Sequence, residues 1–179
     1  MMSFLDLVKK RKSTRNFSSA PVDRAKLERC LEAARLAPSA CNGQPWRFVV
    51  VESLPLREVL AERAFSGVHS MNAFAKKAPV LVVVVTLPTR SPATFAGFLR
   101  RFSYPLIDIG IACEHFVLQA TEEGLDTCWL GWFNEREVKK VLNLKRGERV
   151  HILLAVGCGG GEPTGEKRRK PFPEMAEFR

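Results

Sequence analysis

The sequence predicts an α+β fold in which helices wrap a central mixed β-sheet. Helical and strand-like segments alternate along the chain, and the strand-like segments are β-branched or aromatic runs bounded by proline or glycine. The chain has 179 residues, of which 46% are hydrophobic. This size suits one domain covering residues 1–179, or one subunit whose core is completed by a partner.

The clearest helix begins after Asp23, a suitable N-cap, and is stopped by Pro38. Its apolar residues have the i, i+3, i+4, i+7 spacing of one helix face: Leu27, Cys30, Leu31 and Ala34. Further helices are expected over residues 3–10 and after Asn134, where Glu137 has the spacing of a capping box.

A longer helix is expected over residues 105–125, and it is apolar almost all round. A helix of this kind is buried within a subunit or between subunits. Because so small a chain has few elements with which to cover it, we expect a homodimer. The apolar positions are Ile109, Ala112, Phe116, Leu118 and Ala120.

Four short segments have the composition of strands: residues 46–51, 80–86, 127–132 and 150–156. The longest apolar run, residues 78–85, includes the start of the second strand and is too short to span a bilayer. We therefore expect a soluble protein with no membrane segment.

The cysteines argue for a reducing compartment. They number five and contain no C-x-x-C pair, so the sequence favours neither a disulfide framework nor a zinc site. Residues 1–13 have only scattered apolar side chains before a basic cluster, and they lack a small-residue cleavage site. A cytoplasmic protein without a bound metal is expected.

The formal net charge of +9 admits an anionic ligand, nucleic acid or an acidic surface as partner. If the chain is extended after its first helix, then Arg11, Ser13 and Arg15 point to the same side. Two guanidiniums with a hydroxyl between them suit a phosphate. A solvated helix end is the alternative interpretation. A second basic cluster, residues 167–170, is either a nucleic-acid tail or the other half of the same phosphate site.

The stretch APSACNGQPWRFVVVE, residues 37–52, joins a polar loop directly to an apolar β-branched run. Ser39, Asn42 and Gln44 offer hydroxyl and amide groups to the polar edge of a planar heterocycle. The alternative is that they form a helix C-cap and an ordinary turn.

Together these stretches resemble the nitroreductase-like flavoproteins, which bind FMN. RKSTRNF resembles the family's phosphate-binding R-x-S-x-R motif, and APSACNGQPWRFVVV resembles its flavin loop. DIGIACEHFVLQATEEGLDTCWLGWF resembles the central helix followed by the strand and turn under the flavin ring, and KRRKPFPEM resembles the closing basic motif. The four motifs occur in the family's order and cover nearly the whole chain.

The resemblance implies the following cofactor-binding residues. The phosphate and ribityl chain would be held by Arg11, Lys12, Ser13 and Arg15, with Lys167 and Arg169 closing on the phosphate. The isoalloxazine would be lined by Pro38, Ser39, Asn42 and Gln44, with the backbone of Leu130 and Gly131 near its reactive nitrogen. Asn72 matches a position at the pyrimidine edge, and a helix-cap role is the alternative.

Three features depart from the family pattern. The four consecutive basic residues at 167–170 leave the register of the C-terminal contacts open by one residue. Glu114 and His115 stand where relatives carry a neutral amide, and His115 is expected to be a satisfied core or interface residue. Residues 87–103, where the family varies its substrate cover, are short and rich in arginine and phenylalanine.

The resemblance implies a homodimer with FMN at the subunit interface. The enzyme would use NADH or NADPH to reduce small electrophilic acceptors, such as nitroaromatics, quinones or flavins, by a ping-pong mechanism. No side chain needs to act as acid or base, since the cofactor carries the electron chemistry. One alternative is a specialised flavoenzyme on the same fold, of the dehalogenase, dehydrogenase or flavin-cleaving type. The other is a basic nucleic-acid-binding module, although the aromatic-interleaved motifs of common RNA modules are missing.

Overall fold

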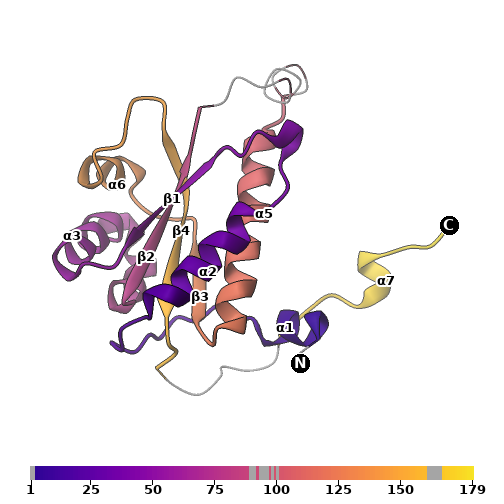
Figure 1. Ribbon diagram of the computed structural model, residues 1–179, viewed down its shortest axis with the longest axis horizontal. Coiled ribbons are helices and arrows are strands. Elements are labelled where there is room, and N and C mark those ends of the chain that lie inside the picture. The colour runs from indigo at the N-terminus through magenta and orange to yellow at the C-terminus, as the bar shows by residue number, and fades with distance from the viewer. Residues whose placement is uncertain (1–2, 89–91, 93–96, 98, 100, 161–166) are drawn as a thin grey trace.

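Helices cover both faces of a four-stranded sheet (Figure 1). The computed structural model describes residues 3–88, 92, 97, 99, 101–160 and 167–179. The sheet has the strand order β1-β2-β4-β3. Its strands are β1 (Trp46–Val51), β2 (Val80–Thr86), β3 (Asp126–Leu130) and β4 (Arg149–Gly157).

The three strand pairs of this sheet are antiparallel. The parallel component of the expected mixed sheet is smaller than predicted, because within the described residues it consists of one bridge between Ser13 and Thr127. Four residues later, Phe17 of the same N-terminal segment forms a second isolated bridge, an antiparallel one with Gly159. The expected α+β class is observed, and its sheet is essentially antiparallel.

Strand β2 lies at the centre of the core. All of its residues except Thr86 are buried, because both faces of the sheet are covered. Leu81, Val83 and Val85 belong to the cluster beneath α3 (Leu54–Ala64). The alternate residues of β2 belong to the cluster beneath α2 (Arg24–Arg35) and α5 (Tyr104–Glu122): Val80, Val82 and Val84. Because successive side chains of a strand point to opposite faces of the sheet, this one apolar strand contributes to both core clusters.

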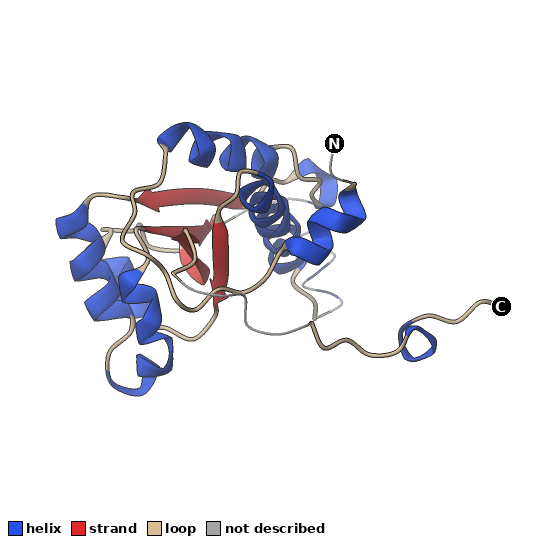
Figure 2. Cartoon of the chain, turned by 90° about the horizontal axis from the view of Figure 1, so that it is seen from below, coloured by secondary structure: helices blue, strands red, loops and turns tan. Residues whose placement is uncertain are grey.

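The remaining helices are α1 (Phe4–Lys10), α6 (Glu135–Val141) and α7 (Phe172–Met175), with 3₁₀ segments η1 (Ala40–Asn42) and η2 (Gly67–Lys77). The predicted caps are present: the side chain of Asp23 accepts from Ala25 N at 3.0 Å, and that of Asn134 accepts from Glu137 N at 3.2 Å. Figure 2 shows the C-terminal segment leading away from the rest of the chain. No helix in the described part of the chain is both long enough and apolar enough to cross a membrane.

Helix α3 was not predicted from the sequence. Leu60, Ala61 and Ala64 are buried, but α3 also carries exposed apolar residues, among them Leu54 and Val59. Apolar residues on both faces blur the 3.6-residue period on which a helix prediction depends. Helix α3 is therefore stabilised by the packing of its buried face against the sheet, and its sequence alone does not show a clear helical period.

Helices α2 and α5 are joined at their solvent side by an ion pair between Arg29 and Glu123. Arg29 Nε and Nη2 donate to the two carboxylate oxygens at 2.6 and 2.7 Å. A third donor is Gln119 Nε2, at 3.1 Å. The hydrogen bond from Arg29 is the main cause that lowers the pKa of Glu123 to about 2, and burial opposes it. The carboxylate is therefore ionised well below the usual range for glutamate.

This pair predicts a defined acid dependence. Because the pKa of Glu123 is lower in the folded chain than the ordinary value of about 4.3, its contribution to stability is present above that value. The contribution is lost as the pH falls toward about 2. We expect Glu123→Gln to be less stable than the parent at pH 7 and the difference to shrink below about pH 4. Urea unfolding across this range measures it, and a difference that is constant with pH would contradict the assignment.

Candidate functional site

The segment after α1 is extended, as the sequence predicted. Thr14 N donates to Thr127 O at 2.9 Å, and Ser13 bridges the same residue of β3. Thr14 and Phe17 are buried, whereas Ser13 and Arg15 are exposed. The side chains of residues 13–15 thus alternate between surface and core, and the backbone bond to β3 fixes which ones reach the surface.

Cationic side chains from the two ends of the chain line one hollow of about 520 Å³. Arg11 stands at the C-cap of α1, and Lys167 and Arg169 come from the C-terminal segment. We call it the basic hollow, and its lining residues are Val8, Lys9, Arg11, Glu114, Lys167 and Arg169. The basic motifs at the two ends of the chain, which the resemblance implied would meet at one phosphate, contribute side chains to the same hollow.

Positive charge is concentrated in the basic hollow. Lys167 Nζ donates to Val8 O at 2.6 Å, which ties the C-terminal segment to α1. Desolvation lowers the pKa of Lys167 below its ordinary value, and the charges of Arg11 and Arg169 lower it further. An anion placed among these groups would reduce their mutual repulsion, and guanidiniums bind phosphate in particular through paired hydrogen bonds. The hollow is therefore suited to a phosphate group.

Arg15 and Lys12 do not line the basic hollow. Burial raises the pKa of the Cys128 thiol, and the charges of Arg15 and Arg11 oppose that shift, so both guanidiniums lie near the same residue of β3. Lys12 instead lines a separate hollow of about 340 Å³ beside the end of α5. The alternation of side chains along the extended segment explains why Lys12 turns away from Arg11.

The loop of residues 38–44 has a backbone of unusual conformation. Three of its non-glycine residues have a positive φ: 50° at Cys41, 51° at Asn42 and 42° at Gln44. The left-handed region costs a residue with a side chain roughly 1–2 kcal/mol, and strain of this kind is found mainly at functional sites. Helix α2 ends at Arg35, so Ser39 and its neighbours do not form its C-cap. The loop instead contains the short 3₁₀ segment η1, with Ser39 directly before it.

Hydrogen bonds within this loop hold its polar groups in place. Gln44 N donates to Ser39 Oγ at 3.0 Å, and Gln44 Nε2 donates to Asn42 Oδ1 at 2.9 Å. Pro38, Asn42 and Gln44 are exposed, and Ser39 is half-buried. The loop thus presents amide groups that are already fixed relative to one another, as recognition of a rigid planar ligand requires.

The turn after β3 joins the side of the molecule that carries η2. Leu130 is buried, Gly131 is exposed, and a Cβ at Gly131 would meet no heavy atom within 4 Å, so the backbone here is open to a ligand. Asn72 Nδ2 donates to Trp132 O at 2.9 Å, and Trp132 Nε1 donates to Val68 O at 2.9 Å. Asn72 therefore helps to hold this turn in place.

Exposed apolar side chains surround this turn. Val68, Met71 and Trp132 are 79%, 74% and 52% exposed, and the His69 ring lies 5.2 Å from that of Trp132. This surface could not be predicted from the sequence, because Trp132 has the composition of a strand end and residues 67–71 have no clear helix or strand pattern. The hydrogen bond between Trp132 and Val68 spans 64 positions of sequence.

Glu114 and His115 occupy different environments on α5. Glu114 lines the basic hollow, where its charge favours the protonated form of Lys167. His115 Nδ1 lies 3.2 Å from Ala33 O on α2, and the ring nitrogen donates to this carbonyl. The expectation that His115 is a satisfied packing residue is confirmed.

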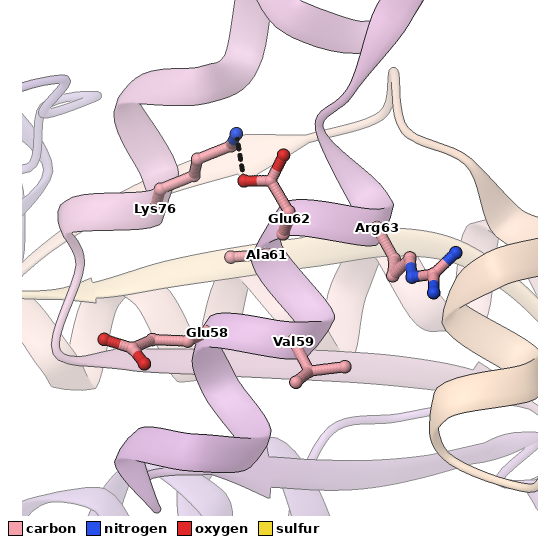
Figure 3. Close-up of a pocket in the computed structure, with 6 residues that line it drawn as sticks. All are labelled: Glu58, Val59, Ala61, Glu62, Arg63 and Lys76. Atoms are coloured by element: carbon pink, nitrogen blue, oxygen red, sulfur yellow. Dashed lines mark hydrogen bonds and ion pairs between the residues drawn. The ribbon is translucent and has the colours of Figure 1, made fainter.

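A hollow of about 590 Å³ lies between α3 and η2 (Figure 3). Lys76 and Glu62 point toward one another across it and form an ion pair of 2.6 Å, while Arg63 points away toward α6. Arg63 lies 3.6 Å from Glu137 there. The hollow contains no surplus of one charge and none of the predicted site residues, so we assign it no function.

Residues 87–103, the expected substrate cover, fall partly outside the described residues, including Arg90, Phe95, Phe98 and Arg100. Arg101 and Phe102 are described and exposed, and the Phe102 ring packs edge-on against Tyr104 at 5.1 Å. Within the part of the chain that the structure describes, no three His, Cys, Asp or Glu side chains gather into a group that could hold a metal ion.

The model of the nitroreductase family matches residues 8–159. The matched range includes the start of the extended segment at Arg11, the 38–44 loop and all four strands. The chain belongs to the nitroreductase family. The match confirms the family that the sequence motifs indicated, and it ends before the basic residues Lys167 and Arg169 of the C-terminal segment.

This nitroreductase family member is similar to a solved structure in fold and to curated relatives in sequence. A crystal structure of a nitroreductase family protein from Clostridium novyi NT has 34% identity and a TM-score of 0.74, and the match covers 88% of this chain and 86% of that one. The oxygen-insensitive NADPH nitroreductase of Helicobacter acinonychis is 30% identical, with 81% of each chain covered. The iodotyrosine deiodinase of Thermotoga neapolitana is 27% identical over 98% of this chain and 96% of its own. The nitroreductase-type fold is confirmed.

Proposed function

We propose that this member of the nitroreductase family is an FMN-dependent oxidoreductase that uses NADH or NADPH to reduce small electrophilic acceptors such as nitroaromatics, quinones or flavins. It forms one domain, residues 1–179, and acts as a homodimer. The observation that carries the proposal is that helix α5 contacts both parts of the site. Glu114 of α5 lines the basic hollow, and Asp108 of α5 binds the strained 38–44 loop.

The spacing along α5 suits a single FMN. Asp108 of α5 accepts a hydrogen bond from Ala40 in the loop, and Glu114 of α5 lines the basic hollow. Six residues of α-helix correspond to about 9 Å at the usual rise per residue. A five-carbon ribityl chain separates a flavin ring from its phosphate over a distance of this order. The length of FMN thus matches this axial spacing, and we propose that its phosphate lies in the hollow and its ring on a 38–44 loop at the subunit interface.

The site residues have separate roles in this proposal. Arg11, Lys167 and Arg169 hold the phosphate, and Ser13 and Arg15 extend the contact toward the ribityl chain. The ring is bound by Pro38, Ser39, Asn42 and Gln44, with the backbone of Leu130 and Gly131 and the amide of Asn72 at its side. Lys12, which lines a different hollow, is left out. Bound FMN supplies the hydride and electron-transfer chemistry, so the protein contributes placement and electrostatics.

The acceptor and the nicotinamide are proposed to bind in turn beside the Gly131 turn. Val68, Met71 and Trp132 offer an apolar surface there, and Gly131 leaves its backbone open. Planar aromatic acceptors suit such a surface, since stacking on exposed aromatic side chains needs no specific hydrogen bond. A single shared face makes simultaneous binding of both substrates impossible.

A reaction in two separable halves is the expected result. Without air, NADH or NADPH should remove the yellow colour of the FMN-loaded protein, and a nitroaromatic or quinone added afterwards should restore it. Steady-state kinetics should follow a ping-pong pattern. Anaerobic mixing with each nicotinamide tests the first half alone. If neither nicotinamide removes the colour, the reductase function is wrong, although FMN binding would still stand.

A homodimer is supported by apolar surface that one chain leaves uncovered. Leu106 and Ile107 on α5 are exposed, and the segment from Pro171 onward leads away from the rest of the chain (Figures 1 and 2). This segment carries the exposed side chains Phe172, Met175 and Phe178. Large exposed apolar groups of this kind normally mark an interface.

Sedimentation should therefore find a dimer for the full chain and a larger monomer fraction when residues 171–179 are removed. The truncation leaves Lys167 and Arg169 in place, so it separates assembly from the phosphate contacts. A full-length monomer that retains FMN would contradict the dimer.

A dehalogenating enzyme is the second candidate. It is favoured by the similarity to the Thermotoga neapolitana iodotyrosine deiodinase, which extends over nearly the whole of both chains. Release of iodide from iodotyrosine by the reduced, FMN-loaded protein would support this candidate. Reduction of nitroaromatics and quinones without iodide release would support the first.

We also infer a cytoplasmic location. All five cysteines have free thiols, and Cys41 is exposed. Free thiols of this kind persist in a reducing compartment. Fractionation of the source cells tests the inference, and recovery of the protein from an oxidising compartment would overturn it.

A further inference from the structure

A buried carboxylate stands directly behind the 38–44 loop. Asp108 is on the second turn of α5 and is 5% exposed. Its Oδ1 accepts a hydrogen bond of 3.0 Å from the main-chain N–H of Ala40, which is 68 positions away in sequence. Burying a carboxylate is costly unless it is hydrogen-bonded or paired. This contact gives the carboxylate a donor and fixes the loop to the helix.

Ala40 is the point at which the loop changes conformation. Ser39 before it is extended, with φ of −148° and ψ of 154°, and the left-handed residues Cys41 and Asn42 follow it directly. Left-handed backbone at residues with side chains persists only where surrounding contacts hold it. The bonds between Ser39, Asn42 and Gln44 hold the loop's internal shape, whereas the bond from Ala40 to Asp108 sets its position on the rest of the protein.

We propose that Asp108 is the positioning residue that presents the 38–44 loop to the flavin ring. This inference rests on the proposed function, because it assigns the loop to the ring of FMN. Asp108 touches neither ring nor phosphate in this arrangement and acts through the Ala40 amide. Its removal should therefore weaken binding of any ligand that carries the ring, whether or not the ligand carries a phosphate.

The test compares FMN with riboflavin, which has the same ring and no phosphate. Asp108→Ala should weaken both flavins by the same factor, about tenfold or more, because a charge-assisted hydrogen bond is lost. Asp108→Asn keeps an acceptor oxygen and should lose much less. Glu122→Ala, at an exposed position on the same helix, is the matched control and should bind both flavins normally. Fluorescence titration measures the affinities, and the absorption bands of the bound flavin should shift in Asp108→Ala and not in Glu122→Ala.

A second variant removes the donor instead of the acceptor. Ala40→Pro eliminates the N–H while keeping a residue type that is tolerated at the first position of a helical turn. It should weaken both flavins as Asp108→Ala does, and the double variant should be no worse than either single one. This pair keeps the proposal testable if one of the variants fails to fold.

The outcomes separate the two proposals. Unchanged affinity of folded Asp108→Ala for both flavins would overturn the role of Asp108 and leave FMN binding intact. A loss confined to FMN would also overturn it, because it would place Asp108 with the phosphate contacts. A parent protein that binds neither flavin would overturn the proposed function and this inference together.

Discussion

The double variant Arg11→Ala/Arg169→Ala should bind FMN about a hundredfold more weakly than the parent and should bind riboflavin almost as well as the parent. Each guanidinium lines the basic hollow, and a hydrogen bond to a charged group contributes about 1.5–3 kcal/mol. Losing two such contacts costs about 3 kcal/mol or more, which corresponds to at least a hundredfold in affinity. Riboflavin lacks the phosphate and loses neither contact.

Arg168→Ala is the matched control for this variant. Arg168 is exposed and lies between two residues that line the basic hollow, but it does not line the hollow itself. Flavin titrations monitored by fluorescence should give it parental affinity. If the double variant also binds FMN as tightly as the parent, Arg11 and Arg169 belong to a solvated surface, and the phosphate site has been placed wrongly.

Phe116→Ala should cause the largest loss of stability among the substitutions considered. Phe116 is fully buried on α5, and its ring stacks on that of Phe48 in β1 with centroids 6.0 Å apart. Truncation of a buried phenylalanine costs about 3–5 kcal/mol, which is a large fraction of the 5–15 kcal/mol that stabilises a typical domain. Because α5 carries both Asp108 and Glu114, loosening it should also disturb the two halves of the site.

Urea unfolding measures this effect, with Leu118→Ala as control. Leu118 is on the same helix and only half-buried, so its truncation leaves a smaller cavity and should cost clearly less. Equal losses in the two variants would show that the packing of Phe116 against the sheet does not hold α5 in place.

Much of the fold could be predicted because its strongest signals are local. The β-branched runs predict β1 and β2 with their observed ends, and the Asp23 cap with its apolar spacing predicts α2. The limits of β3 were placed too late, because the exposed residue Trp132 belongs to the following turn and not to the strand.

The site was only partly predictable, because some of its determinants act over long distances in sequence. Arg11 and Arg169 were found through their motifs. Asp108 was missed, since its function depends on one main-chain amide 68 positions away. Lys12 was grouped with Arg11 on the basis of sequence proximity, whereas the alternation of an extended segment turns it into another hollow.

The central claim is that the basic hollow and the 38–44 loop bind FMN in the homodimer, with one site per chain. The visible absorption spectrum of the purified full-length protein, recorded before and after addition of FMN, tests it most directly. We predict a yellow protein, or a colourless one that takes up one FMN per chain. A colourless protein that takes up no added FMN would contradict the account.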